Sequence, residues 1–189
     1  MHYPIFLDLA ERPVVVVGGG RVAMRKTRSL LAAGARVAVI SPAATAMVRR
    51  WAKGGRVRWV RRRYRAGDLR GARLAVAATD DETVNRQVCS EARRRKIFVN
   101  CAAPPGAGDF LVPSVMRRGP LAVAISTGGA SPALARQMRR DLEQFMGRRY
   151  ARAAQKMRRI RRTATGDVPL ARDRRELYRR ILRKLLVER

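Results

Sequence analysis

The stretch VVVVGGGRVAMRK, residues 14–26, decides the fold of this chain. Its four consecutive valines, Val14–Val17, form an apolar block of strand length, which is typical of a strand covered on both faces. The residues after the glycines have helical character as far as Gly34, a common stop signal for a helix. The stretch therefore predicts a strand over 12–17, a glycine turn and a helix over 21–33.

The glycine turn matches the pattern GxGxxA of dinucleotide-binding proteins, and it lies between a predicted strand and a predicted helix, as the pattern requires. Gly18 permits the tight turn, Gly20 lets a pyrophosphate approach the backbone, and Ala23 lets helix and strand pack closely. We predict that Gly18 and Gly20 bind a cofactor whose pyrophosphate lies on the helix N-terminus, where free N–H groups favour anions. A glycine-rich turn without a cofactor is the alternative.

The chain continues to alternate between strand and helix. Apolar blocks and turn residues predict strands over 35–40, 57–60, 74–78 and 97–100, and helices over 43–53 and 82–95. This order predicts an α/β fold of the Rossmann type, with a parallel sheet and helices on both of its faces.

Two strand ends carry further candidate cofactor contacts, because ligands of open α/β sheets bind at the carboxyl ends of strands. The strand ending at Ile40 lacks the acidic residue that usually holds the ribose. Ser41 is expected to supply one hydrogen bond instead, and the backbone at Pro42 and Ala43 to contact the adenosine end. Thr79 and Asp80 follow another strand, where contact with the cofactor and capping of the next helix are compatible roles.

The second half has a different pattern. A strand is predicted over 121–126, and Ser131 followed by Pro132 predicts the start of a helix that runs to about Phe145. The rest is basic and helical with a break near Thr165, which predicts two helices. We place domain boundaries to give a nucleotide-binding domain at 1–112, a middle segment at 113–147 and a basic helical region at 148–189.

Composition limits the function classes. The 189 residues include 43 Lys and Arg against 14 Asp and Glu, a formal net charge of +29. Such a field attracts nucleic acid, anionic lipid or an acidic small molecule, although a biased genome composition also enriches arginine. His2 is the only histidine, and Cys89 and Cys101 form no CxxC motif, so we expect no metal site. No apolar run approaches the roughly 20 residues that span a bilayer, and a cytoplasmic protein is expected.

Several segments resemble the precorrin-2 dehydrogenases, in the same order and over residues 3–146. The segments are VVVVGGGRVAMRK (14–26), LLAAGARVAVISP (30–42), AATDDETVN (77–85), FVN (98–100), DFLVPS (109–114) and ISTGGASPALAR (125–136), and PIFLDL (4–9) fits the family's opening strand.

The resemblance implies a function and a set of roles. The family oxidises precorrin-2 to sirohydrochlorin with NAD on the route to siroheme, and some members also insert iron. It implies an interlocked homodimer built by the central segment. Arg21-Val22 and Pro42-Ala43 match the family's cofactor-contacting pairs, and Thr127 matches a serine near its active site. Asn100, Thr127 and Arg136 are the expected substrate contacts, since arginines bind carboxylates of the kind that precorrin-2 carries.

One departure from the family pattern concerns the chemistry. Where the family has an aspartate credited with acid/base work, this chain has Ala103, which cannot transfer a proton. Asp109 lies in the same loop region and is our candidate catalytic residue. With a single histidine and no carboxylate at position 103, iron insertion is disfavoured. Two rival hypotheses remain: a dinucleotide- or tetrapyrrole-binding protein that has lost catalysis, and a basic protein that binds nucleic acid non-specifically.

Overall fold

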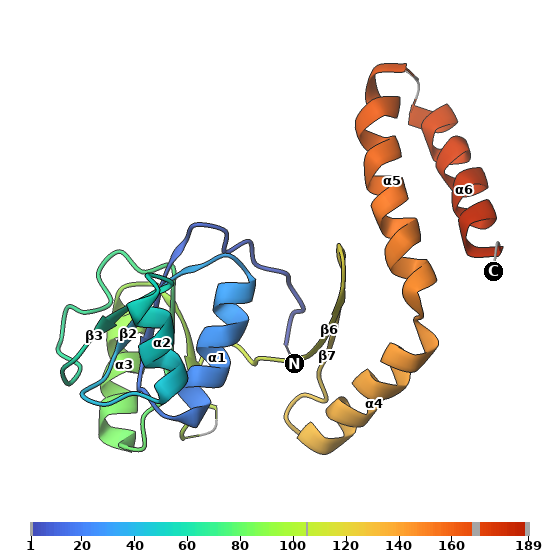
Figure 1. Ribbon diagram of the computed structural model, residues 1–189. Helices are drawn as coiled ribbons and strands as arrows, with labels where there is room; N and C mark the ends of the chain where they lie inside the picture. The colour runs from blue at the N-terminus through green and yellow to red at the C-terminus, as the bar shows by residue number, and fades with distance from the viewer. Residues whose placement is uncertain (1, 105, 168–170, 188–189) are drawn as a thin grey trace. The chain divides into compact units, whose positions relative to one another are not determined.

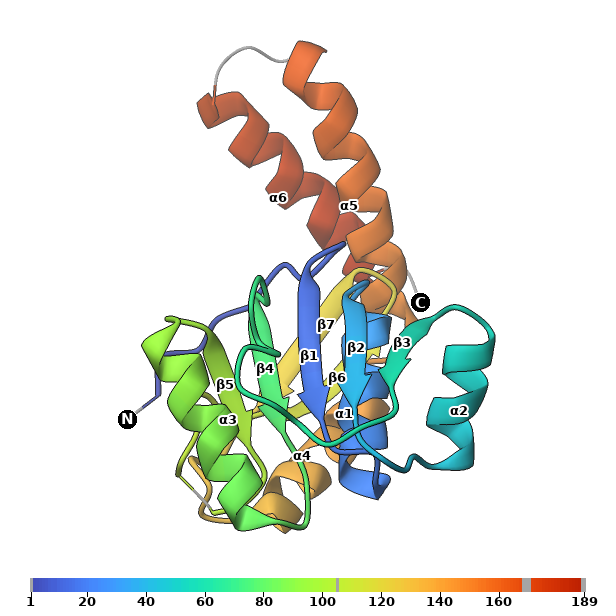
Figure 2. The same cartoon turned by 90° about the vertical axis from the view of Figure 1, so that its left-hand side faces the viewer.

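The computed structural model describes residues 2–104, 106–167 and 171–187, and the chain forms two units, Met1–Val112 and Pro113–Arg189. The first unit contains a five-stranded parallel sheet of order β3-β2-β1-β4-β5 (Figure 2). Its strands are β1 (Pro13–Val17), β2 (Arg36–Ile40), β3 (Val57–Val60), β4 (Leu74–Ala77) and β5 (Phe98–Cys101). Its helices are α1 (Arg21–Ala32), α2 (Ala46–Lys53) and α3 (Glu82–Arg94). The predicted Rossmann-type α/β fold is confirmed.

Both faces of this sheet are covered, as the unbroken valine run of β1 predicts. Val14 and Val16 belong to a core with residues of α1 and α2, whereas Val15 and Val17 belong to a second core with residues of α3. Figure 1 shows α1 and α2 on one side of the strands and α3 on the other. Ala23 is fully buried, so α1 packs closely on the sheet. The carboxyl ends of the strands therefore meet at one edge, which is where ligands bind in such sheets.

Most predicted elements differ from the observed ones by one residue at an end, but α2 begins three residues later than predicted. Thr45 is its N-cap, and the Thr45 side chain accepts a hydrogen bond from the Val48 N–H. The segment from Pro42 to Ala44 is consequently a loop rather than the start of a helix. This loop contacts the glycine turn, because the Thr45 N–H donates to the Gly19 carbonyl at 2.9 Å.

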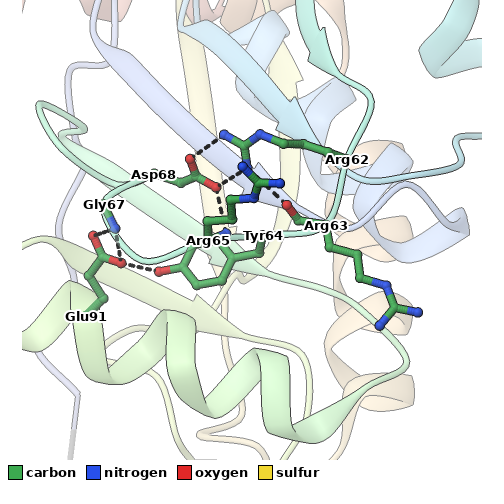
Figure 3. A network of polar contacts seen from close by, with 7 residues as sticks. All are labelled: Arg62, Arg63, Tyr64, Arg65, Gly67, Asp68 and Glu91. Atoms are coloured by element: carbon green, nitrogen blue, oxygen red, sulfur yellow. Dashed lines mark hydrogen bonds and ion pairs between the residues drawn. The ribbon is translucent and has the colours of Figure 1, made fainter.

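A network of polar contacts fixes the long connection between β3 and β4 (Figure 3). Glu91 of α3 is 3% exposed, and its carboxylate accepts hydrogen bonds from the Tyr64 hydroxyl, the Gly67 N–H and Arg95. Within the connection, Arg62 donates two hydrogen bonds of 2.7 Å to Asp68. The buried carboxylate thus holds an irregular segment against α3.

Burial alone would raise the pKa of Glu91, but the hydrogen bonds from Tyr64, Gly67 and Arg95 outweigh it and hold that pKa below its usual value. Burial, and secondarily the hydrogen bond to Glu91, raise the pKa of Tyr64. For Asp68, the hydrogen bond from Arg62 is the largest influence and lowers the pKa. Folding therefore favours the ionised form of both carboxylates.

The second unit combines a two-stranded antiparallel sheet with three helices. The strands are β6 (Ser114–Arg118) and β7 (Leu121–Ile125), and the helices are α4 (Pro132–Phe145), α5 (Arg148–Asp167) and α6 (Ala171–Val187). Strand β6 was not predicted, since the basic sequence SVMRR gives no apolar block, and its pairing with β7 makes it a strand. Helices α5 and α6 lie side by side, with the Arg161 guanidinium 5.9 Å from the Tyr178 ring centre.

The start of the chain corrects one expectation. Residues 4–9 were expected to form an opening strand, but they form no strand and pair with neither edge of the sheet. Tyr3, Ile5 and Phe6 are exposed, and within this segment only Leu9 is buried in the core.

None of the described helices is long and apolar enough to span a bilayer. The predicted further boundary at residue 147 stays a prediction.

Candidate functional site

The glycine turn after β1 is packed on both sides by backbone. Gly18 has a φ of +118°, and a Cβ placed there would lie 2.2 Å from the Ala78 carbonyl oxygen. A Cβ at Gly19 would lie 2.0 Å from the Ala43 carbonyl oxygen. Both positions therefore require glycine. The need at Gly18 follows from the sequence pattern, whereas the need at Gly19 does not, because the pattern leaves that position open.

Gly20 differs from its two neighbours, since a Cβ there would meet nothing within 4 Å. It is the N-cap residue of α1, and within the described part of the chain no side chain caps the N–H groups of the first turn. Arg21 and Val22, which begin the helix, are exposed. An exposed helix N-terminus with free donors and room above its backbone fits a diphosphate group.

The loop after β2 lies beside this turn. Ser41 is buried, and its hydroxyl donates to the Ala43 carbonyl at 2.7 Å, while its own carbonyl accepts from the Trp59 indole N–H at 3.0 Å. Pro42 and Ala43 are exposed. The Ser41 proton is thus used inside the loop, which leaves the hydroxyl oxygen as an acceptor. The predicted hydrogen bond between Ser41 and a ribose is therefore one that the Ser41 oxygen would accept.

The end of β4 is held by a buried amide that sequence reasoning missed. The Asn85 side chain of α3 accepts from the N–H and the hydroxyl of Thr79 and donates to the Thr79 carbonyl. Asp81 is the N-cap of α3 and accepts from Thr83 and Val84. Asp80 is therefore not the capping residue, and it is exposed at the carboxyl end of the sheet. This leaves its carboxylate available for a ligand.

The loop after β5 contains Ala103 and the candidate catalytic residue Asp109. The Asp109 carboxylate accepts from the Val99 N–H at 3.0 Å and lies 3.9 Å from Arg93 Nε, while the Asp109 N–H donates to the Val99 carbonyl. Asp109 thus ties the loop to the edge of the sheet. The Cys101 thiol donates to the Ala103 carbonyl at 3.1 Å.

Two residues near this loop join helix α1 to strand β5. The Lys26 ammonium of α1 donates to Asn100 Oδ1 at 2.6 Å, and Asn100 Nδ2 donates to the Phe110 carbonyl at 2.8 Å. Asn100, an expected substrate contact, is 5% exposed and already holds these two partners. Burial, and secondarily the charge of Arg25, lower the pKa of Lys26. Lys26 was not among the residues predicted from sequence.

The remaining predicted substrate contacts, Thr127 and Arg136, belong to the second unit. The Thr127 hydroxyl accepts from the Ser131 N–H at 3.0 Å, and Ser131 caps α4 by accepting from the Leu134 N–H, as predicted. Arg136 is exposed on α4. Among the described residues, no group of three His, Cys, Asp or Glu side chains is placed to hold a metal ion.

The fold and the open glycine turn define a dinucleotide-binding protein. Residues 5–114 match a family described as "Putative NAD(P)-binding", and residues 118–144 match one described as "Sirohaem biosynthesis protein central". The solved structure of SirC, a precorrin-2 dehydrogenase, is 30% identical, covers 98% of this chain and 97% of its own, and has a TM-score of 0.76. The chain belongs to the NAD(P)-binding family of sirohaem biosynthesis that includes this dehydrogenase.

Longer relatives are similar in sequence over most of this chain. The siroheme synthase of Methylococcus capsulatus is 42% identical over 181 residues, which are 96% of this chain and 38% of that protein. Siroheme synthase 2 of Cronobacter sakazakii is 45% identical over 168 residues, 87% of this chain and 37% of that protein. This chain therefore spans less than half the length of these relatives.

Proposed function

We propose that this chain oxidises precorrin-2 to sirohydrochlorin with NAD, on the route to siroheme. The observation that carries the proposal is the open N-terminus of α1 at Gly20, in a chain that is similar to SirC over almost its whole length. A diphosphate needs free backbone donors and space above them, and both are present at this turn.

The reaction removes a hydride and a proton from the reduced macrocycle, and a bound nicotinamide ring supplies the hydride acceptor. This chain's own residues provide binding and orientation. The first turn of α1 binds the diphosphate, and Gly18 and Gly19 fix the turn between neighbouring backbone segments. The Pro42-Ala43 backbone contacts the adenosine end, while Thr79 and Asp80 lie at the end of β4. Holding two reactants in a reactive geometry accelerates such a transfer substantially.

Removal of the proton is a separate step. We assign it to Asp109, because Ala103 cannot accept a proton. Asp109 is fixed by the Val99 backbone and lies near Arg93, in the loop that follows β5. Asp109→Asn keeps an oxygen that accepts from the Val99 N–H but removes the base. We expect single-turnover oxidation to slow by about 100-fold. An unchanged rate would show that Asp109 has no part in proton removal.

We assign the cofactor as NAD, because the precorrin-2 dehydrogenases that the sequence resembles use NAD. The family description covers NAD and NADP, and no acidic residue follows β2 to hold the 2′-hydroxyl of NAD. Oxidation rates measured with each nucleotide test the assignment. The substrate's carboxylates are assigned to arginines such as Arg136, which is exposed on α4.

We also assign the chain a homodimeric state. The second unit has only two strands, and an isolated two-stranded sheet is marginal in water. Val115 of β6 and its cross-strand neighbour Ala124 of β7 are both exposed. The same face carries the exposed Arg117 opposite Ala122, so this face is uncovered within the unit and combines apolar side chains with one charge. A second copy of this chain is the partner that would cover it.

The deciding experiment is an anaerobic assay of the full chain with precorrin-2 and either NAD or NADP, followed by absorbance of the macrocycle and of the reduced nucleotide. We expect sirohydrochlorin to form in equal amount to reduced NAD. Gly20→Val is the matched control, since its side chain has space in the fold but occupies the place of the diphosphate. A folded wild-type chain that binds neither nucleotide would overturn the proposal.

One observation favours a second candidate function. With Ala103 in place of the family's aspartate, a protein that binds nucleotide and tetrapyrrole without turnover keeps every contact described above. The same assay separates the two: tight binding of both ligands with no product identifies the non-catalytic protein. Repeating it with iron or cobalt and sirohydrochlorin tests for metal insertion.

A further inference from the structure

A single buried amide joins three parts of the chain that are distant in sequence. Asn100 lies at the end of β5, and its two side-chain atoms contact Lys26 of α1 at 2.6 Å and the Phe110 carbonyl at 2.8 Å. Phe110 follows the loop that contains Ala103, and its ring packs against the core beneath α1. Lys26 thus acts on both ends of this loop through one side chain.

Several of the described cations that lie partly inside the protein have a carboxylate partner, and Lys26 is not one of them. Arg62, Arg95 and Arg139 each pair with a carboxylate. Among the described residues, Lys26 has no ion pair, and its ammonium donates to a neutral amide. Arg118 is likewise held by a neutral group, the backbone carbonyl of Glu143. A partly buried charge without a counter-charge costs stability, which an apolar side chain at the same place would avoid. A role of the Lys26 charge in the dehydrogenase site would account for a lysine at a position where an apolar residue would be more stable.

The same loop is held from the opposite face of the sheet. Arg93 of α3 donates to the Ala107 carbonyl at 2.7 Å and lies near the Asp109 carboxylate. A Cβ at Gly108 would lie 2.8 Å from the Cys101 nitrogen, so the returning segment runs tightly along β5. The loop is therefore clamped from both faces, and Lys26 provides the clamp on the α1 side.

We propose that Lys26 is a positioning residue of the dehydrogenase site: through Asn100, its ammonium group holds the 101–110 loop in the arrangement that catalysis requires. The proposal rests on the proposed function. It adds to that function a residue other than the one at the family's acid/base position, which is Ala103 in this chain. The effect of Lys26 passes through Asn100 and Phe110.

The charge of Lys26 makes the proposal testable by pH. An ammonium donates a stronger hydrogen bond than a neutral amine does. Burial and Arg25 lower the pKa of Lys26 from 10.5, so the ammonium is lost at a lower pH than in an ordinary lysine. Asn100 and the Phe110 carbonyl, the other groups in this contact, do not titrate. We expect kcat to fall at alkaline pH as Lys26 loses its proton.

The experiment compares Lys26→Met, Lys26→Arg and the control Lys53→Met in the full chain. Lys53 is exposed at the end of α2, so its replacement makes the same chemical change away from the loop. We expect Lys26→Met to lower kcat by about 10- to 100-fold, with the affinity for nucleotide nearly unchanged. Lys26→Arg keeps a charged donor and should restore activity at neutral pH while removing the alkaline fall.

A second readout does not depend on activity. Amide hydrogen exchange of residues 101–110, measured without nucleotide, should be faster in Lys26→Met than in wild type, and unchanged in Lys53→Met. If Lys26→Met has the same kcat and the same loop exchange rates as the wild type, Lys26 does not have the proposed role. The proposal is also overturned if kcat of Lys26→Arg still falls at alkaline pH. If the wild type itself oxidises no precorrin-2, the proposed function fails, and the catalytic role of Lys26 fails with it.

Discussion

The two units of this chain bury their apolar residues in different ways. In the first unit, five strands lie between two cores, so the central strand β1 is buried on both faces. In the second unit, β6 and β7 form a ribbon with one uncovered face, and the described residues include only four buried apolar side chains. These are Met116, Ile125, Ala135 and Ala153.

This difference indicates how each unit reaches stability. The first unit has a core, paired carboxylates and backbone contacts that are complete within Met1–Val112. Both units expose large apolar side chains, among them Ile5, Phe6 and Phe98 in the first and Val115, Leu134, Met138 and Phe145 in the second, but the second unit has far fewer buried ones beside them. We expect the first unit to be stable by itself and the second to depend on protein concentration, because association stabilises a folded state by mass action.

The largest expected effect comes from Gly18→Ala in the first unit. The new Cβ would lie 2.2 Å from the Ala78 carbonyl oxygen, at a φ of +118° that alanine rarely adopts. We expect the free energy of unfolding to fall by about 4 kcal/mol or more. Denaturant unfolding measures it, with Gly20→Ala as the control, which adds a Cβ without a clash and should cost only about 1 kcal/mol, because alanine is a poorer N-cap than glycine. Equal stabilities of the two variants would mean that the turn is not packed as described.

The next effect concerns the second unit. Val115→Asp places a charge on the uncovered face of β6, where desolvation on association is costly. We expect the dissociation constant of the dimer to rise by about 100-fold, or about 2.7 kcal/mol, by sedimentation. Met47→Asp is a matched control, since Met47 of α2 is as exposed as Val115. A dimer unaffected by Val115→Asp would place the interface elsewhere.

The smallest of the three effects returns to the first unit. Glu91→Gln removes the buried charge that accepts from Tyr64, Gly67 and Arg95, and should lower the free energy of unfolding at neutral pH by about 2 kcal/mol. Glu82→Gln, in an exposed pair with Arg86, should change it by about 0.5 kcal/mol or less.

The pH dependence of that effect has a definite sign. The pKa of Glu91 is lower in the folded chain than its usual 4.5, so its stabilising contribution is fully present above that value. The contribution is lost as pH falls below 4.5 and through the folded pKa. The difference between wild type and Glu91→Gln should therefore shrink in acid. A difference that stays constant down to acid unfolding would mean that the Glu91 charge is not responsible.

Local patterns were sufficient to predict most of the fold. Val57–Val60 and Pro132–Phe145 were predicted with their observed ends, because apolar blocks and a Ser-Pro start signal are local features. Strand β6 was missed because its pairing with β7, and not its composition, makes it a strand. The opening segment at 4–9 was predicted as a strand although no edge of the sheet receives it.

The site could be predicted from the sequence only where a motif reflects the conformation or close approach of the backbone. Gly18, Gly20 and Ala23 follow from the close approach of a turn, a helix and a ligand. The contact of Lys26 with Asn100 joins residues that are 74 positions apart, and no local pattern encodes it. The same holds for Asn85, whose amide is buried against Thr79.

The middle glycine of the turn has a consequence for cofactor binding. Gly19 faces the Ala43 carbonyl, and the Gly19 carbonyl accepts from the Thr45 N–H, so the glycine turn and the loop after β2 are bound to each other. If the proposed nucleotide contacts both segments, a displacement of one is transmitted to the other. Adenosine and pyrophosphate added together are then expected to bind more tightly than their separate affinities suggest.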